Sequence, residues 1–281
     1  MTNFENKIDF AVVVSVKNAN PNGDPLNGNR PRENYDGCGE ISDVCLKRKI
    51  RNRMQDMELP VFVKSDDRSD DGFKSLKDRA DACKPFAAAV KKKDVEEAKR
   101  IACSEWLDVR SFGQLFAFKG DDASIGIRGP VSIHPAFSVD TIDVTATQIT
   151  KSVNSVPGAK KASDTMGMKY RVDFGVYVFY GSINCQLAEK TGFSMEDAEN
   201  IRKALTTLFE NDSSSARPEG SMEVCKVFWW KHNSKSGQYS SAKVHRTLHV
   251  RPKTDAPKSI EDYEIIVDEL EGLEPEIFEG T

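Results

Sequence analysis

The sequence has no long hydrophobic run, and this absence limits where the protein can work. No stretch of its 281 residues approaches the roughly 18 consecutive apolar residues that a membrane-spanning helix requires. The N-terminus, MTNFENKIDF, also lacks the basic, apolar and small-residue order of a signal peptide. With 38% hydrophobic and 30% charged residues, the composition is that of a globular protein. We therefore expect a cytoplasmic protein without a membrane partner.

Cysteine pairs with disulfide-type or zinc-type spacing are absent as well. The six cysteines are scattered and include no C-x-x-C, which fits neither a disulfide framework nor a zinc site. We expect reduced thiols that serve mostly as small core residues. They are Cys38, Cys45, Cys83, Cys103, Cys185 and Cys225.

Signatures of catalysis are equally scarce. There is no G-x-S-x-G, and PGAKKAS lacks the second glycine of a phosphate-binding P-loop. His245 and His249 are four residues apart, but KVHRTLHVRP alternates like a strand and has no Glu between them, which indicates partly exposed strand histidines rather than metal ligands. The acidic pairs at 66–67 and 70–71 lie in a polar stretch that predicts a solvated turn. The sequence therefore predicts no cofactor, no metal and no enzymatic activity.

The net charge of −4 lacks the positive sign expected of a nucleic-acid-binding domain, but the charge is unevenly distributed. Residues 255–281 hold ten acidic residues and one lysine, a local balance of −9, so the residues before them carry +5. Segments 43–53 and 151–171 each carry +4, and 226–253 hold seven positive residues, three histidines and no acid. These basic clusters favour a polyanionic partner. The acidic C-terminal segment could aid solubility or dock a basic neighbour.

Hydrophobic periodicity predicts alternating strands and helices. Residues 60–120 predict a helical insertion that includes one alanine-rich helix beginning at Pro85. Outside it we predict, in chain order, a buried strand at 8–16, a helix at 42–57 capped by Ser42 or Asp43, strands at about 126–148 and 169–184, a helix at 194–210 capped by Ser194, and a strand at 222–231. This order is that of a ferredoxin-like domain of the RNA-recognition (RRM) type, which places the protein in the α+β class.

The predicted helix at 42–57 carries the strongest signal for RNA binding. With its apolar residues on one face, Lys47 and Arg51 lie one turn apart along one flank, and Lys49 and Arg53 along the other. Such a rack of cations one turn apart can contact successive phosphates, because phosphate contacts need charge and reach rather than base identity.

The segment RVDFGVYVFY loosely resembles the aromatic RNP1 strand of an RNA-recognition domain. However, Asp173 stands where that pattern has its first glycine, and both faces of the strand are apolar. We therefore predict that the aromatic residues of this strand and of the strand at 222–231 pack in the core. They are Phe174, Tyr177, Phe179, Tyr180, Phe228, Trp229 and Trp230.

Five ordered segments resemble the backbone subunit of a type I CRISPR Cascade surveillance complex, in the Csd/Csh branch of the RAMP superfamily, and most closely its type I-C form. The segments are FAVVVSVKNANPNGDP, SDVCLKRKIR, DVRSFGQLFA, GIRGPVSIHPAFS and MGMKYRVDFGVYVFYG. The resemblance implies a non-catalytic subunit that binds CRISPR RNA (crRNA), oligomerises head to tail along its spacer, kinks it at intervals and presents it for pairing with target DNA. Implied partners are crRNA, target DNA, further copies of the chain, and the 5′-handle-binding, large and small Cascade subunits.

The resemblance also implies a hand-like organisation. Residues 1–59 and 121–254 would form the ferredoxin-like palm, 60–120 the fingers, and about 148–168 a protruding thumb hairpin, followed by the acidic segment 255–281. Lys47 and Arg51 match cations of the family's helix, and Asn20 and Asn22 lie in the family's loop after the first strand. The RNA-binding candidates are Asn20, Asn22, Arg30, Lys47, Lys49, Arg51, Lys151 and Lys169. The apolar thumb candidates for displacing a base are Val153, Val156, Met166 and Met168.

The loop NANPNGDPLNGNRPREN at 18–34 has two Asn-Gly pairs but no alternating strand beside it, so we predict a long polar loop in the RNA groove rather than a hairpin. Two other functions remain open. One is a metal-dependent endoribonuclease, with Asp164 near the thumb as the candidate catalytic residue. The other is a general RNA-binding chaperone.

Overall fold

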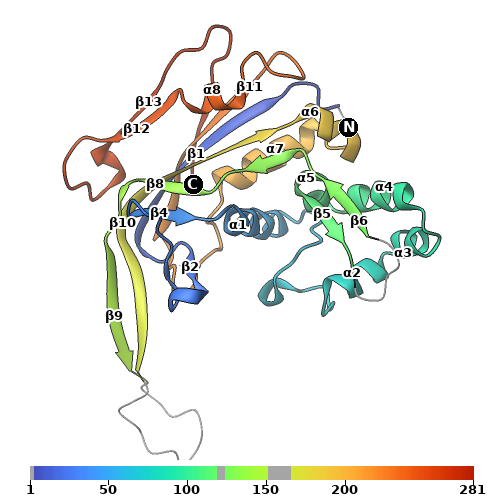
Figure 1. The fold of residues 1–281 in the computed structure, drawn as a ribbon, viewed down its shortest axis with the longest axis horizontal. Coiled ribbons are helices and arrows are strands. Elements are labelled where there is room, and N and C mark those ends of the chain that lie inside the picture. Colours follow the sequence, from blue (N-terminus) through green and yellow to red (C-terminus); the bar gives the residue numbers. More distant parts are fainter. Residues whose placement is uncertain (1–2, 119–123, 151–165) are drawn as a thin grey trace, which may run out of the picture.

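The computed structural model describes residues 3–118, 124–150 and 166–281, and its centre is a large antiparallel sheet (Figure 1). The hydrogen-bonded order is β14-β11-β1-β10-β8-β4, and β7 and β9 also pair with β10. The strands of this sheet are β1 (Ile8–Ala19), β4 (Cys38–Ile41), β7 (Val131–Ile133), β8 (Ala136–Thr141), β9 (Val144–Thr150), β10 (Met166–Ile183), β11 (Met222–Lys231) and β14 (Glu276–Glu279).

Three small two-stranded sheets and the helices complete the described chain. The small sheets pair β2 (Gly23–Asp24) with β3 (Arg30–Pro31), β5 (Gly113–Phe116) with β6 (Ile125–Arg128), and β12 (Leu248–Pro252) with β13 (Tyr263–Val267). The helices are α1 (Asp43–Asp56), α2 (Leu76–Ala82), α3 (Lys84–Lys91), α4 (Val95–Glu105), α5 (Leu107–Phe112), α6 (Cys185–Thr191), α7 (Met195–Thr206) and α8 (Ser241–His245), with short 3-10 turns η1 (Pro25–Asn27), η2 (Asp66–Arg68) and η3 (Ile260–Asp262). None of the described helices is long and apolar enough to cross a membrane.

The predicted first strand is confirmed, and β1 is buried on both faces. Phe10 and Val12 belong to the core cluster that contains the apolar residues of α1 and α7, whereas Ala11 and Val13 belong to the cluster under α8, β12 and β13. Residues alternate between the faces of a strand, so a strand covered on both sides is apolar throughout. The seven aromatic residues of β10 and β11 that were predicted to pack in the core are in these clusters or packed against them.

Both predicted helix starts in the main layer are confirmed. The Ser42 hydroxyl accepts a hydrogen bond from the N–H of Cys45, which satisfies a free donor in the first turn of α1. Ser194 and Asp197 form a capping box at the start of α7, each side chain accepting from the other's backbone N–H. Two amphipathic helices therefore pack on one face of the sheet.

The strand-like stretch predicted at about 126–148 is extended, but it is divided into more strands than expected. The segment forms β6, β7, β8 and most of β9, and β6 pairs with β5 outside the large sheet. Pro130 and Pro135 stand between these strands, where the missing N–H of proline interrupts the ladder.

The single helix predicted from Pro85 is wrong, because the chain turns between α3 and α4. Lys93 adopts a left-handed backbone conformation (φ 58°), and the Asp94 side chain then accepts from the N–H of Glu97 to begin α4. The insertion has its own core, centred on the rings of Phe62, Phe86 and Trp106.

A two-stranded arm projects from the sheet (Figure 1). It consists of β9 paired with Met166–Val172 of β10, in register from Val144↔Val172 to Thr150↔Met166. The C-terminal residues, in contrast, fold back onto the molecule. The Tyr263 hydroxyl donates to Asp140 (2.8 Å), Leu273 is buried, and β14 pairs with β11, so residues 255–281 are part of the fold.

Candidate nucleic-acid interface

The loop after β1 contains a small hairpin, so the prediction that it has no second strand is wrong. Residues of β2 and β3 pair as Gly23↔Pro31 and Asp24↔Arg30. Between them, the Asp24 side chain accepts from the N–H of Leu26, and Gly28 and Asn29 both have positive φ values (59° and 62°). These left-handed residues reverse the chain at little cost, which is a property of Asn and Gly.

The two candidate asparagines of this loop make internal hydrogen bonds. The Asn22 Oδ1 accepts from both the N–H and the hydroxyl of Ser42 (2.9 Å each), so it fixes the residue that caps α1. The Asn20 side chain is buried and donates to the carbonyl of Asn29 (2.7 Å). In this arrangement both side chains hold the loop against the sheet and α1.

An acid faces each of the four α1 cations that were predicted to contact phosphates. Lys49 is 3% exposed and pairs with Asp212, and burial lowers its pKa. Arg53 pairs with Glu210, from the segment that follows α7. Lys47 pairs with Asp43 one turn earlier (3.1 Å) and keeps a quarter of its side chain exposed. Of these, Lys47 is the one best placed to exchange its carboxylate for a phosphate.

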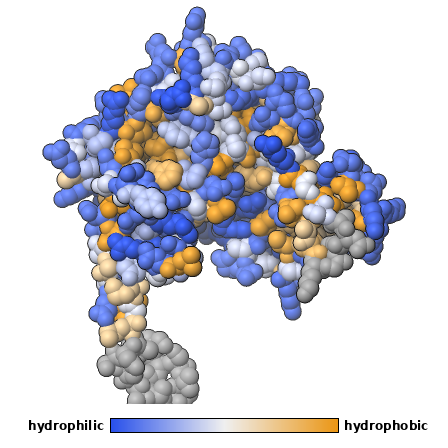
Figure 2. Space-filling model, viewed as in Figure 1, coloured by the Kyte–Doolittle hydropathy of each residue, from blue (hydrophilic) through white to orange (hydrophobic). Residues whose placement is uncertain are grey.

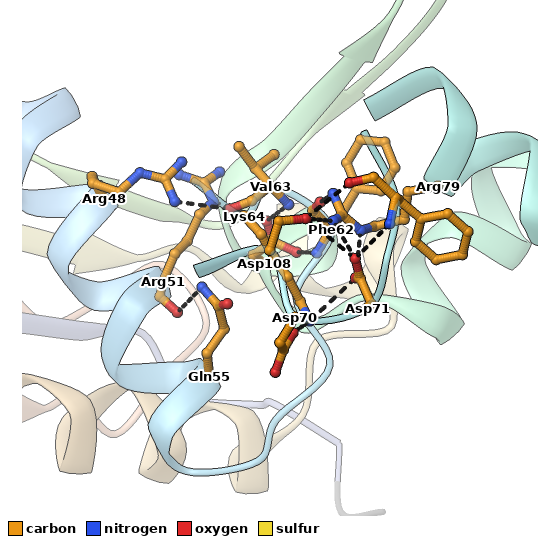
Figure 3. A network of polar contacts seen from close by, with 12 residues as sticks. Arg48, Arg51, Gln55, Phe62, Val63, Lys64, Asp70, Asp71, Arg79 and Asp108 are labelled. Carbon is orange, nitrogen blue, oxygen red and sulfur yellow. Dashed lines mark hydrogen bonds and ion pairs between the residues drawn. The ribbon is translucent and has the colours of Figure 1, made fainter. Parts of the chain in front are cut away.

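Arg51 belongs to a buried network that joins α1 to the insertion (Figure 3). Its Nε donates to Oδ2 of Asp108 on α5 (2.8 Å), and Asp108 is fully buried. The same carboxylate accepts the backbone N–H groups of Phe62 (2.7 Å) and Val63 (3.1 Å). Arg51 therefore acts as the counterion of a buried carboxylate, and this explains why it is charged without being exposed.

The acidic pair at 70–71, predicted as a solvated turn, lies at the other end of this network. Asp71 accepts from Arg79 Nε and Nη2 (2.9 and 2.8 Å), which holds its pKa well below the ordinary value. Lys64 contacts both Asp70 and Asp71 (2.8 and 3.2 Å). Both carboxylates are thus neutralised by cations. No group of three or more His, Cys, Asp or Glu side chains in the described ranges could hold a metal ion.

The arm has two chemically different faces. Successive side chains of a strand point to opposite faces. On β10, Met166, Met168 and Tyr170 therefore lie on one face of the arm, and Lys169 and Arg171 lie on the other. Met166 and Met168 are about half exposed, and Figure 2 shows pale orange residues along the arm. Exposed thioether side chains beside a cationic face are suited to contacting bases and phosphates respectively.

Lys169 is the candidate cation whose charge is most available. It is exposed, and no described residue forms an ion pair with it. Arg171, by comparison, lies 3.4 Å from Asp173. Arg30 from β3 packs over the Tyr170 ring at the base of the arm (5.6 Å) and lies 3.8 Å from Glu33. The structure thus places Lys169, Met166 and Met168 on the arm and Arg30 against Tyr170 at its base.

Four further candidates of the sequence lie outside the described residues. They are the RNA-binding candidate Lys151, the apolar candidates Val153 and Val156, and the possible ribonuclease residue Asp164. The prediction that His245 is a partly exposed strand residue is wrong, because it lies on α8 and is buried. Its neighbour His249 does lie on a strand, β12. The Ser240 side chain caps α8 by accepting from Lys243 N–H (3.3 Å), and this local signal was missed.

Sequence reasoning also missed Tyr170, Arg171 and Asp108. The alternation of Met166, Met168 and Tyr170 with Lys169 and Arg171 was visible in the sequence and marks a two-faced strand. Asp108 carries no local signal, since its partner Arg51 is 57 residues away.

Comparisons with known proteins relate this chain to CRISPR-associated proteins. A chain of a solved CRISPR RNA-guided surveillance complex, pre-nicking, has a similar fold, with a TM-score of 0.50 and 15% identity over 80% of this chain and 78% of that chain. The family model for CRISPR-associated protein Cas7 matches residues 6–268, so the chain belongs to the Cas7 family. A CRISPR-associated protein Cas7 from Haloferax volcanii is 26% identical over 94% of this chain and 82% of that protein.

Proposed function

We propose that the protein is the crRNA-binding backbone subunit of a type I Cascade complex of subtype I-C. Copies assemble head to tail along the spacer in the cytoplasm, kink the RNA at intervals and present it to target DNA. The observation that carries this proposal is the two-faced arm on a chain of the Cas7 family. The large sheet, with β11-β1-β10-β8 as its centre and α1 and α7 on one face, acts as a ferredoxin-like palm. Residues 60–120 are its fingers and the arm is its thumb.

RNA is held chiefly at the arm and the β2–β3 hairpin. Lys169, Arg171, Arg30 and Lys47 supply charge, and the methionine face supplies the apolar surface that enters the base stack. Unstacking a base costs a few kcal/mol, which an apolar wedge offsets by burying its own surface against neighbouring bases. Four other candidates support RNA binding without touching RNA, because their contacts hold the loop, α1 and the fingers in place. They are Asn20, Asn22, Lys49 and Arg51.

The subunit is non-catalytic and needs no cofactor, and sequence selection is left to base pairing by the guide. Its partners are crRNA, target DNA, further copies of itself, and the 5′-handle-binding, large and small subunits. We prefer this function to an RNA chaperone because the fixed, two-faced arm suits a repeated contact rather than indifferent binding.

Purification with a co-expressed CRISPR array tests the proposal. A complex carrying one discrete short RNA with a repeat-derived 5′ end is expected. Lys169→Ala should reduce the RNA recovered, and Lys203→Ala, which removes an exposed lysine of α7, is the matched control. Recovery of the assembled protein without RNA, or with a random mixture of cellular RNAs, would refute it.

A further inference from the structure

Two turns beside the arm expose apolar side chains almost completely. The relative exposure of Tyr35 is 109% and that of Leu26 is 96%. Tyr35 stands in a turn in which Asn34 Oδ1 accepts the N–H groups of Asp36 (3.0 Å) and Cys38 (2.9 Å). Since the turn is already ordered by these bonds, a partner that binds Tyr35 loses little affinity to conformational ordering. Rigid exposed aromatic side chains are typical anchors of protein interfaces.

The charges around Tyr35 do not suit a phosphate backbone. The neighbouring Arg32 lies 3.6 Å from Asp24, so its charge is partly compensated. Asp36 is exposed and forms no ion pair with any described residue. The turn therefore presents an aromatic ring next to an uncompensated negative charge, which points to a partner with an apolar site beside a positive one.

The same chain carries such a site elsewhere on its surface. A groove of about 450 Å³ lies between β8, β10 and β12, and Figure 2 shows hydrophobic residues gathered there at the upper left of the molecule. Its lining includes His134, Phe137, Tyr180, Leu248 and Arg251 and no acidic residue. Phe137, the second residue of β8, is 42% exposed and leaves a large ring open to a partner.

The charge at the rim of this groove is positive. Arg251 is exposed and forms no ion pair with the described residues, although Glu264 lies opposite it in the β12–β13 register. His249, by contrast, is paired with Asp268 (2.8 Å). The groove thus offers aromatic and aliphatic walls with one available guanidinium, which complements Tyr35 and Asp36 in both polarity and charge.

We propose that Tyr35 of one copy inserts into the β8–β12 groove of the next copy, with Asp36 facing Arg251. The anchor and the groove are different surfaces, so each joint leaves one free anchor and one free groove, and the contact can be repeated along a chain of copies. This inference rests on the proposed function, which requires copies to lie side by side along the guide, and it names the surfaces that join them.

The first test compares Tyr35→Ala with wild type on two RNAs, one long enough for several copies and one short enough for a single copy. Association between copies on the long RNA should weaken at least about tenfold, and affinity for the short RNA should not change. Mass photometry measures the number of copies on each RNA. Leu115→Ala removes a side chain that is 61% exposed on the fingers and should have no effect.

The second test exchanges the two charges. Asp36→Arg and Arg251→Asp should each reduce the number of copies on the long RNA, and the two changes combined in one chain should restore it. Normal assembly by Tyr35→Ala, or no rescue by the combined exchange, would overturn the inference while leaving the proposed function intact. Weaker binding of Tyr35→Ala to the short RNA with unchanged association would show that Tyr35 stacks on a base instead. Failure of wild type to bind either RNA would refute the proposed function itself.

Discussion

Removing Arg51 should damage the fold more than it weakens RNA binding. The guanidinium is the counterion of Asp108, which is fully buried, and Arg51 itself keeps only 12% of its side chain exposed. Arg51→Ala would leave a carboxylate buried beside two backbone N–H donors but without a positive charge. Breaking a buried pair in this way costs about 3–5 kcal/mol, a large part of the roughly 5–15 kcal/mol that stabilises a typical domain.

Urea unfolding followed by fluorescence gives the free energy of unfolding directly. Lys47→Ala is the matched control, because Lys47 is one turn earlier on α1 and its pair with Asp43 is partly exposed. Such a pair contributes about 0–1 kcal/mol. Asp108→Asn combined with Arg51→Ala should recover part of the loss, since no charge is then left alone and the amide oxygen still accepts a backbone N–H. If Arg51→Ala lost less than about 1 kcal/mol and mainly reduced RNA affinity, the structural role given to Arg51 would be wrong.

Three further outcomes follow from the structure. Lys169→Ala should lower the salt dependence of RNA binding by roughly 0.7 units of log K against log salt, measured by fluorescence anisotropy, and an unchanged slope would contradict a phosphate contact. Burial lowers the pKa of His245 below its ordinary 6.5, so below that pH the unfolded chain binds a proton that the folded chain does not, and stability falls as the pH drops. His245→Gln should make the melting temperature depend less on pH, and the same pH profile for variant and wild type would exclude this role. Asn22→Ala should cost about 1–3 kcal/mol, seen as a lower urea midpoint, because it leaves the Ser42 N–H and hydroxyl unpaired.

Local patterns predicted the main layer of this fold. The apolar run of β1, the spacing of Leu46, Ile50 and Met54, and the cap at Ser42 each contain their signal within a few residues. The tight turns were harder, since left-handed conformations at Gly28 and Asn29 decide whether a polar loop folds into a hairpin. Composition alone does not determine such a reversal.

The candidate site was predicted less well, because charge in the sequence does not reveal which charges are paired. Lys49 and Arg51 were indistinguishable from Lys47 until the fold brought Asp212 and Asp108 to them. Lys169, in contrast, stays exposed because the arm leaves the body of the protein. Long-range ion pairs therefore engage Lys49 and Arg51 within the fold, whereas the charge of Lys169 on the arm stays available.

The number of copies per complex against spacer length tests the central claim most directly. The number of copies of a backbone subunit that lies along the guide should rise in whole steps as the spacer is lengthened and fall as it is shortened. Native mass spectrometry of complexes purified with a series of spacers measures this count. A number of copies that stays the same across the series would contradict the account.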